Sequence, residues 1–514
     1  MLGMRATFFG CVFVTCAVQA IAGPPDADFN GDGFADLAIG IPHQVVNGVP
    51  EAGAVAVLYG SPGGLDPDTD QLWDLSNANL PGSAANSGLM GDSLAAGDFD
   101  GDGRTDLAIG IPRYDVGSKS DAGAVLILYG TGGGLKATGS QLWHREINGI
   151  EGNAARNAEF GSALTAADFD GDGRDDLAIG VPDSDVDGRS DAGDVHVLYG
   201  SSSGLRSAGN QVWSQNSSGI LDSCENDDLF GFALASGDFN RDGFADLAIG
   251  VPFEDAGGAS AVGAVNIIYG SANGLTSNQD QFLVQGEGGL ADAANEGDSF
   301  GTALAVGRMN KGGFEDLLVG VPGEVVNGRE SAGAIHVIYG SASGLTGTGD
   351  EVFHQNITGM KDTPEVNDNF GYALAVANLL GGSQQEAIVG ISEGIGVASG
   401  AGAVQLIRGS RTGLQVNGNQ LWHENKSGVS DDAETDDMFG GALAHGDYNG
   451  DGWVDLAVGV PGQEVSGAAA AGAIHIFFGT STGLSTAGTQ WWHQDSAGIK
   501  GVAEAGDRFG ASLR

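Results

Sequence analysis

The stretch Asp98-Phe-Asp-Gly-Asp-Gly-Arg-Thr-Asp106 is followed at once by the apolar run Leu107-Ala-Ile-Gly-Ile111. It places three carboxylates at alternate positions, a glycine where the chain must turn, and a fourth carboxylate at its ninth position. Ca²⁺ is a hard cation that takes six to eight oxygen ligands at roughly 2.3–2.6 Å, and this loop supplies such oxygens. The apolar run is typical of a buried strand. The sequence therefore predicts a cation-binding loop between two strands.

Equivalent loops recur along the chain at a nearly constant interval. They begin at Asp28, Asp98, Asp168, Asp238, Arg308, Asn378 and Asp447, so the interval is 70 residues five times and then 69. Each unit holds four short segments rich in Val, Ile, Leu and aromatic residues, separated by glycine-containing turns, which is typical of four strands. Repeats of a four-stranded meander indicate a β-propeller, whose blades usually number about four to eight.

An open solenoid is the competing repeat architecture, and the two ends of the chain favour a closed ring instead. The first unit begins almost at its acidic loop and lacks the Phe-Gly segment that opens the other units. The segment Phe509-Gly-Ala-Ser-Leu513 supplies such an opening at the C-terminus. We therefore predict an all-β, seven-bladed β-propeller of four-stranded blades over residues 23–514, with the C-terminal strand completing the first blade.

Several motifs occurring together resemble those of a known family. They are the Phe-Gly openings, Gly-x-Pro after the second strand, Ala-Gly-Ala before the third strand, and the D-x-[DN]-x-D-G-x-x-D loops. From Gly23 to Arg514 the chain resembles the FG-GAP repeats of integrin α-subunit head domains and of FG-GAP proteins secreted by bacteria. The resemblance implies calcium loops between the first and second strands of certain blades, and it implies a role in adhesion.

Five of the seven loops keep a full set of oxygen donors, and calcium at about five ions per chain is the predicted cofactor. Asparagine at the third loop position lowers the charge but keeps an oxygen. The predicted side-chain ligands are Asp28, Asn30, Asp32 and Asp36; Asp98, Asp100, Asp102 and Asp106; Asp168, Asp170, Asp172 and Asp176; Asp238, Asn240, Asp242 and Asp246; and Asp447, Asn449, Asp451 and Asp455. The predicted backbone-carbonyl ligands are Phe34, Arg104, Arg174, Phe244 and Trp453.

Two alternatives to these calcium loops follow from the sequence. An EF-hand needs a bidentate Glu at position twelve, where the first two loops have Ile39 and Ile109, so that interpretation fails. Asp and Gly also favour turns in the absence of any metal. Within each of the five acidic clusters, however, the carboxylates would repel one another if no cation were bound. We expect the calcium to be structural.

The fifth and sixth loops have lost the acidic pattern, and we expect neither to bind a divalent ion. The fifth has Arg308, Asn310 and Gly312 and keeps Asp316, while the sixth has Asn378, Leu380 and Gly382 and keeps Glu386. We expect Arg308 to pair with Asp316 in place of the missing cation.

The charge and the histidine positions argue against two classes of function. With 21 basic and 67 acidic residues, the net charge of −46 argues against nucleic acid as a partner, because phosphates are neutralised by Lys and Arg. Seven of the nine histidines recur at two repeat positions, which is typical of packing rather than of a single active site. They are His144, His354, His423 and His493 at one position, and His196, His336 and His475 at the other. We therefore predict no catalytic residue and no enzyme activity.

The N-terminus indicates export. Arg5 precedes an apolar stretch from Ala6 to Ile21, and Ala20-Ile21-Ala22 offers a cleavage site, so residues 1–22 are predicted to be a signal peptide. Cys224 would then be the lone cysteine of the mature chain, without a disulfide partner. No later run has the 18 or more apolar residues typical of a membrane helix. The protein is thus expected to be secreted, extracellular or at the cell surface.

The connections of most variable sequence fall on the side opposite the acidic loops, because successive strands of a blade run antiparallel. They are residues 43–51, 113–121, 183–191, 253–261, 323–331, 392–399 and 462–470. Variable loops on a rigid scaffold are a usual place for binding, so we expect a recognition or adhesion module for an extracellular protein or carbohydrate.

Two other functions stay open from the sequence. One is an extracellular hydrolase or lyase acting on polysaccharide or lipid near the central channel, which repeat-breaking carboxylates or histidines around that channel would favour. The other is a structural part of a larger surface assembly. An exposed aromatic or apolar patch on the variable side would instead favour binding.

Overall fold

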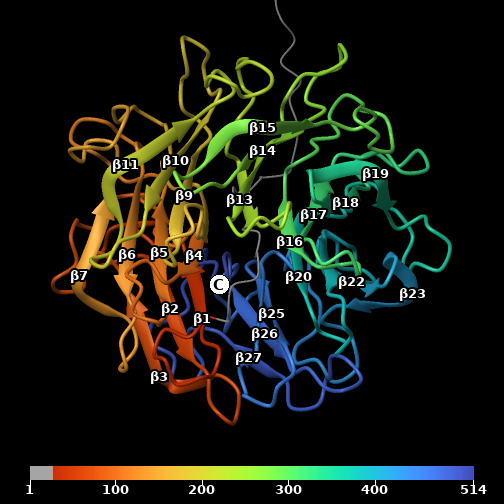
Figure 1. The fold of residues 1–514 in the computed structure, drawn as a ribbon. Coiled ribbons are helices and arrows are strands. Elements are labelled where there is room, and N and C mark those ends of the chain that lie inside the picture. The colour runs from red at the N-terminus through yellow and green to blue at the C-terminus, as the bar shows by residue number, and fades with distance from the viewer. Residues whose placement is uncertain (1–26) are drawn as a thin grey trace, which may run out of the picture.

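The computed structural model describes residues 27–514, so the predicted signal peptide lies outside the described residues. The strands form seven antiparallel sheets, and each sheet is one blade (Figure 1). The blades follow one another in chain order around a centre near which the C-terminus lies. The all-β, seven-bladed propeller that the repeats predict is confirmed.

Each blade is a meander whose strands run outward from the centre in sequence order. The innermost strands are β4 (Leu94–Gly97), β8 (Ala163–Ala167), β12 (Ala233–Gly237), β16 (Leu304–Gly307), β20 (Ala373–Ala377) and β24 (Leu443–Gly446). The next are β1 (Leu37–Ile41), β5 (Asp106–Ile111), β9 (Asp176–Val181), β13 (Asp246–Val251), β17 (Asp316–Val321), β21 (Glu386–Ile391) and β25 (Asp455–Val460). The third are β2 (Ala54–Tyr59), β6 (Ala124–Tyr129), β10 (Asp194–Tyr199), β14 (Ala264–Tyr269), β18 (Ala334–Ser341), β22 (Ala403–Ser410) and β26 (Ala473–Phe477). The outermost are β3 (Asp66–Trp73), β7 (Lys136–Trp143), β11 (Arg206–Trp213), β15 (Thr276–Leu283), β19 (Gly344–Phe353), β23 (Gly413–Trp422) and β27 (Gln490–Trp492).

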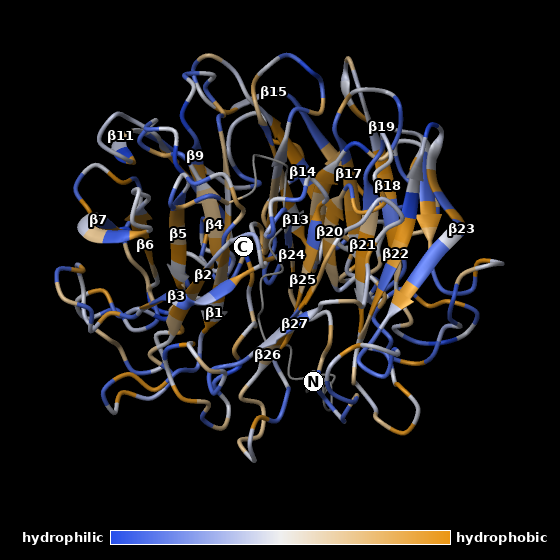
Figure 2. Cartoon of the chain, turned by 90° about the horizontal axis from the view of Figure 1, so that it is seen from below, coloured by the Kyte–Doolittle hydropathy of each residue, from blue (hydrophilic) through white to orange (hydrophobic). Residues whose placement is uncertain are grey.

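The hydrophobic core lies between the faces of neighbouring blades. Every residue of β5 and β6 is buried, because a middle strand of a blade is covered on both faces by the adjacent blades. The outer strand β7 instead mixes half-buried and exposed residues. Figure 2 shows the same contrast, with hydrophobic residues in the inner strands and hydrophilic residues gathered in the loops and along outer strands such as β23.

A recurring tyrosine joins each of several blades to the next one. Tyr129, which ends β6, donates its hydroxyl proton to Gln141 Oε1 at 2.7 Å and accepts the backbone N–H of Leu205 in the following blade at 3.3 Å. Gln141 Nε2 in turn donates to the carbonyl of Leu205 at 3.1 Å. Tyr59, Tyr199 and Tyr269 make the corresponding contacts.

The last blade contacts the first, as a ring requires. Gln490 of β27 accepts the N–H of Leu65 at 3.1 Å and donates to its carbonyl at 3.1 Å. Residues near the C-terminus lie along β1, where Gly40 N donates to Ser512 O at 2.9 Å and Arg514 N donates to Ala38 O at 2.9 Å. The first sheet is nevertheless assigned three strands, β1 to β3, so its completion by a C-terminal strand stays a prediction.

Candidate metal centres

The loop that precedes β5 folds around the carboxylate of Asp98. Asp98 Oδ1 accepts the N–H groups of Gly101 at 2.8 Å and Asp102 at 3.0 Å, and Oδ2 accepts that of Gly103 at 2.9 Å. Gly101 and Gly103 have φ of 72° and 87°, in the left-handed region that glycine adopts without strain. The loop therefore closes on Asp98 through its own backbone.

The structure brings three of the four predicted carboxylates of this loop together. Ligand oxygens of Asp98, Asp100 and Asp106 lie within 4.8 Å of one another, and those of Asp168, Asp170 and Asp176 do the same in the third loop. Hard cations prefer such all-oxygen sets. These residues could hold calcium, and burial together with the neighbouring aspartates raises the pKa of Asp100 and of Asp170.

The fourth carboxylate, Asp102, contacts an arginine instead of joining the cluster. Asp102 Oδ2 lies 3.3 Å from Arg104 Nη1, and Asp102 Oδ1 accepts the Arg104 N–H at 3.0 Å. Asp172 and Arg174 repeat the ion pair at 3.2 Å. The complete predicted ligand sets, including the backbone carbonyls of positions such as Arg104, stay predictions.

Loops with asparagine at the third position have the same local fold. Asn30 Oδ1 accepts the Asp32 N–H at 2.8 Å, just as Asp100 Oδ1 accepts the Asp102 N–H at 3.1 Å. Asn240 and Asn449 make the equivalent bond at 2.8 Å. The asparagine thus keeps an oxygen at the position where the other loops place a carboxylate.

The ninth-position carboxylate anchors the loop backbone in addition to any role as a ligand. Asp106 is 1% exposed, and it accepts the N–H of Phe99 at 3.0 Å and that of Gly130 at 2.9 Å. Burial is the main cause that raises its pKa to about 8. Glu386 makes the corresponding bond to Leu379 N at 2.9 Å in a loop without the other acids. Anchoring therefore explains why this carboxylate remains where the other ligands are lost.

The predicted pairing of Arg308 with Asp316 is wrong. Arg308 Nη2 lies 3.7 Å from Oε1 of Glu315, the neighbouring residue. Asp316 is fully buried, and its oxygens accept the N–H groups of Met309 at 3.0 Å and Gly340 at 3.1 Å. Because adjacent strand residues point to opposite sides, Arg308 can reach only one of the two acids.

Sequence reasoning missed that the acidic loops are linked to one another around the ring. The Asp98 N–H donates to Asp175 Oδ2 of the next blade at 2.8 Å, and the Asp238 N–H donates to Glu315 Oε2 at 2.9 Å. The side chain of Arg104 lies against Gly31 of the preceding loop, 3.1 Å from where a Cβ atom would stand. The sequence signal for these links was a hydrogen-bond acceptor at the eighth position of the loop, which is Asp175 in the third loop and Glu315 in the fifth.

Two further groups of carboxylates lie on the opposite face, and sequence reasoning missed them too. One consists of Glu225, Asp228 and Glu254, and the other of Glu365, Asp368 and Glu393, with ligand oxygens within 4.8 Å in each group. Burial is the main cause that raises the pKa of Glu254 and of Glu393 to about 9, and nearby acids add to the effect. The sequence offered one signal for these groups, because equivalent acids such as Glu225 and Glu365 lie about two repeats apart.

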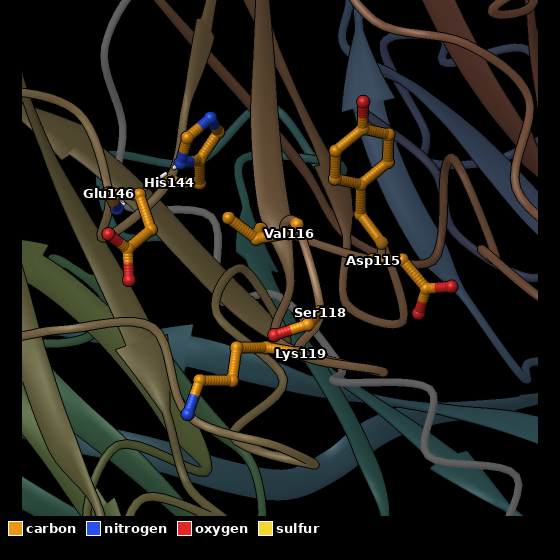
Figure 3. Close-up of a pocket in the computed structure, with 8 residues that line it drawn as sticks. Asp115, Val116, Ser118, Lys119, His144 and Glu146 are labelled. Atoms are coloured by element: carbon orange, nitrogen blue, oxygen red, sulfur yellow. Dashed lines mark hydrogen bonds between the residues drawn. The ribbon is translucent and has the colours of Figure 1, made fainter.

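The recurring histidines His196, His336 and His475 are buried, which agrees with the packing interpretation. His144 lines a pocket of about 510 Å³ on the opposite face, together with Tyr114, Lys119 and Glu146 (Figure 3). His144 Nδ1 accepts the N–H of Glu146 at 3.2 Å, so this ring nitrogen stabilises a turn.

Comparison with known proteins identifies the repeats. The FG-GAP repeat family matches residues 27–58, 90–128, 160–198, 230–265 and 439–477. Each matched segment contains one of the five loops with intact donors, and the fifth and sixth loops lie outside them. This chain is an FG-GAP repeat protein. Among its described residues, no helix is long and apolar enough to cross a membrane.

The FG-GAP repeats are similar in sequence to two kinds of curated protein. Integrin alpha-PS2 of Drosophila melanogaster is 32% identical over 244 residues, which are 46% of this chain and 16% of the relative. Integrin alpha-5 of Xenopus laevis is 32% identical over 47% of this chain and 20% of the relative. Phosphatidylinositol-glycan-specific phospholipase D of Rattus norvegicus is 33% identical over 38% of this chain and 23% of the relative. The aligned region thus spans less than a quarter of each of these relatives.

The structural match to a solved protein, the exotype rhamnogalacturonan lyase YesX, spans 78% of this chain and 56% of the lyase chain. The TM-score is 0.31 and the identity is 14%, so this similarity carries no functional argument.

Proposed function

We propose that this FG-GAP propeller is a secreted or cell-surface recognition module that binds an extracellular protein or carbohydrate, with calcium in a structural role. The observation that carries the proposal is the position of the exposed large apolar side chains. Among the described residues they are Val45, Leu221, Phe253, Val325, Val366, Val397 and Val502. All seven lie in connections on the face opposite the acidic loops.

Their distribution supports binding on that face. Val45, Phe253, Val325 and Val397 follow the second strands of their blades, Leu221 and Val366 precede the first strands β12 and β20, and Val502 follows β27. Scattered exposed apolar residues are ordinary, but their restriction to one face of the ring supports the proposal that this face makes the contacts. The similarity to integrin alpha-subunits agrees with such a role and extends only to the aligned region.

The acidic loops support a structural role for calcium. They connect strands within a blade, and backbone bonds such as Asp98 N–H to Asp175 link them to the next blade. An ion bound there would neutralise carboxylates that the fold holds together, and its binding free energy would add to the stability of the chain. Extracellular modules typically bind calcium at about 10⁻⁴–10⁻³ M.

The competing proposal is an extracellular hydrolase or lyase. In its favour, a cavity of about 220 Å³ at the acidic-loop face is lined by Asp175 and Glu315, and burial raises the pKa of both. Each of these carboxylates, however, accepts a backbone N–H from a neighbouring loop, which is a structural task. The similarity to the phospholipase D covers 23% of that relative. We therefore favour recognition.

The test is a binding screen of the mature chain on immobilised extracellular proteins and a glycan array, in about 1 mM calcium and in excess chelator. We expect one ligand class to be retained in calcium and to be lost or weakened in chelator. Phe253→Ser should weaken that binding without changing the melting temperature. The control, Lys311→Ser at an exposed side chain of the fifth loop, which lacks the acidic set, should leave it unchanged in calcium. Hydrolysis or cleavage of an arrayed glycan or lipid, abolished by Asp175→Asn, would instead establish the enzyme.

A further inference from the structure

The two carboxylate groups on the opposite face share one design at equivalent junctions between blades. Glu225 and Asp228 lie in the connection from the third blade to the fourth, and Glu254 follows β13 in the fourth blade. Glu365, Asp368 and Glu393 occupy the same places between the fifth blade and the sixth. Each group therefore bridges two blades, on the face that carries no acidic repeat loop.

Two of the three carboxylates in each group are buried. Asp228 and Glu254 are 1% and 2% exposed, and Asp368 and Glu393 are 2% and 4% exposed. Glu225 and Glu365 are exposed, so each group can be reached from solvent. A buried carboxylate is costly unless it is protonated or paired with a positive charge.

A buried glutamine at each junction supplies the second, independent observation. Gln215 is 1% exposed, and its Nε2 donates to Glu254 Oε2 at 2.5 Å, so its amide lies against the group. Gln355 is 2% exposed and donates to Glu393 Oε2 at 3.1 Å. The Oε1 atom of each glutamine accepts no hydrogen bond from the described residues. A buried amide oxygen without a hydrogen bond keeps the full desolvation cost of a polar group, and a cation would satisfy it.

A related junction shows that the same place accepts a positive charge. Between the second and third blades, Arg145 stands at the position of Gln215, and Ser184 stands at that of Glu254. Arg145 is 6% exposed, donates to Ser184 Oγ at 3.0 Å and pairs with Asp194. Ala155 and Ala158 replace the two acids of the connection there. The junction that contains the Arg145 guanidinium thus lacks the carboxylates that are present at the junctions of Glu254 and Glu393.

We propose that each of these two junctions binds a divalent cation of the calcium class. Its ligands are the carboxylates of Glu225, Asp228 and Glu254 with Gln215 Oε1, and the equivalent set of Glu365, Asp368 and Glu393 with Gln355 Oε1. Three carboxylates and an amide form an all-oxygen set, which selects a hard cation. They supply four of the about six to eight oxygens that Ca²⁺ takes, so positions stay open on the solvent side.

The junction between the fourth and fifth blades provides a matched control. Gln285 Oε1 also lacks a partner there and Nε2 donates to Glu324 Oε2 at 3.2 Å, but Asn295 stands in place of the first glutamate. The orphaned oxygen is thus common to several junctions. At this one Asn295 Nδ2 donates to Asp298 Oδ2 at 3.2 Å, so an amide N–H instead of a carboxylate oxygen faces Asp298, and the junction is expected to bind no cation.

The experiment counts calcium bound to the mature chain after dialysis against about 1 mM calcium. Five loops and two junctions predict seven ions per chain, and the double variant Glu254→Gln/Glu393→Gln should lose two of them. Glu324→Gln should lose none, and Asp100→Ala/Asp170→Ala should lose two whether or not the junctions bind metal. The proposal is overturned if the junction variant and the parent bind the same number of ions.

A second measurement keeps the test decisive if the junction variant fails to fold. In crystals of the unsubstituted chain grown with calcium, an anomalous difference peak is expected between Glu254, Asp228 and Gln215 Oε1, at roughly 2.3–2.6 Å from their oxygens. Ordinary solvent density there, with anomalous peaks at the acidic loops, would overturn the junction sites and leave the structural calcium of the loops intact.

Discussion

At the scale of single residues, burial decides which groups carry charge. His475 is fully buried against Phe439 and Phe477, and its Nε2 lies 3.2 Å from Glu424 Oε1. Burial lowers the pKa of His475 to about 4 and raises that of Glu424 to about 8. Both shifts favour the uncharged forms at neutral pH, so we interpret the contact as a hydrogen bond between neutral groups rather than an ion pair.

The lowered pKa of His475 predicts a loss of stability in acid. The folded state binds this proton less readily than the unfolded chain, so the contribution is complete above about pH 6.5 and is lost as the pH falls toward about 4. Between about pH 7 and pH 5 the loss from His475 alone amounts to about 2 kcal/mol, whereas Glu424, whose pKa is raised, contributes with the opposite sign. His475→Gln, which copies the buried Gln405 of the sixth blade, should reduce this loss. Urea unfolding of parent and variant at both pH values measures it as the difference between their pH dependences, and identical pH dependences would contradict the assignment.

At the scale of elements, the acidic loops separate anchoring from metal binding. Asp100 accepts one backbone N–H, that of Asp102 at 3.1 Å, and is otherwise free to act as a ligand. Glu386 anchors a loop that lacks the other acids, through Leu379 N at 2.9 Å and Leu380 N at 3.2 Å. The same local fold thus forms with and without a candidate metal site.

Substitutions in these two loops should therefore respond differently to calcium. Asp100→Ala is expected to change the free energy of unfolding little in chelator, where relief of the repulsion from Asp98 and Asp102 offsets one lost hydrogen bond, and to lower it in calcium, because a bound ion is lost. Glu386→Gln is expected to cost about 1–3 kcal/mol equally in both conditions. Denaturant unfolding with and without calcium gives the comparison. A calcium-dependent effect of Glu386→Gln, or none for Asp100→Ala, would reverse the two assignments.

How far the sequence predicts each element depends on whether its contacts are local. The acidic loops lie within nine residues and repeat with the blades, so their positions, and the local clustering of acids such as Asp98 and Asp106, could be read directly. The pairing of Arg308 depended on which of two adjacent residues faces it, and only the structure decides that. The junction groups join Gln215 to Glu254 across two blades, which no local pattern reveals. Recurrence at repeat-equivalent positions would have been the only guide.

At the scale of the whole molecule, the two faces of the ring differ in their chemistry. One carries the repeated acidic loops, joined from blade to blade by bonds such as Asp238 N–H to Glu315. The other carries the exposed apolar side chains, the His144 pocket and the junction carboxylates. A propeller holds both faces in fixed positions only if its first and last blades stay together. The stability of that contact is therefore a property on which the proposed recognition would depend.

Closure of the ring by the C-terminal residues is the last prediction. Gly40 N donates to Ser512 O, Ala38 N donates to Arg514 O, and the side chain of Leu513 is 4% exposed. Leu513→Ala should therefore cost about 2–5 kcal/mol, whereas Val502→Ala, at a side chain that is 64% exposed, should cost little. Deleting residues 512–514 should abolish hydrogen-exchange protection of the Ala38 and Gly40 amides and leave the amides of β5 protected, because only β1 loses its neighbour. Retained protection at Ala38 and Gly40 in the shortened chain would show that the first blade holds its edge without the C-terminus.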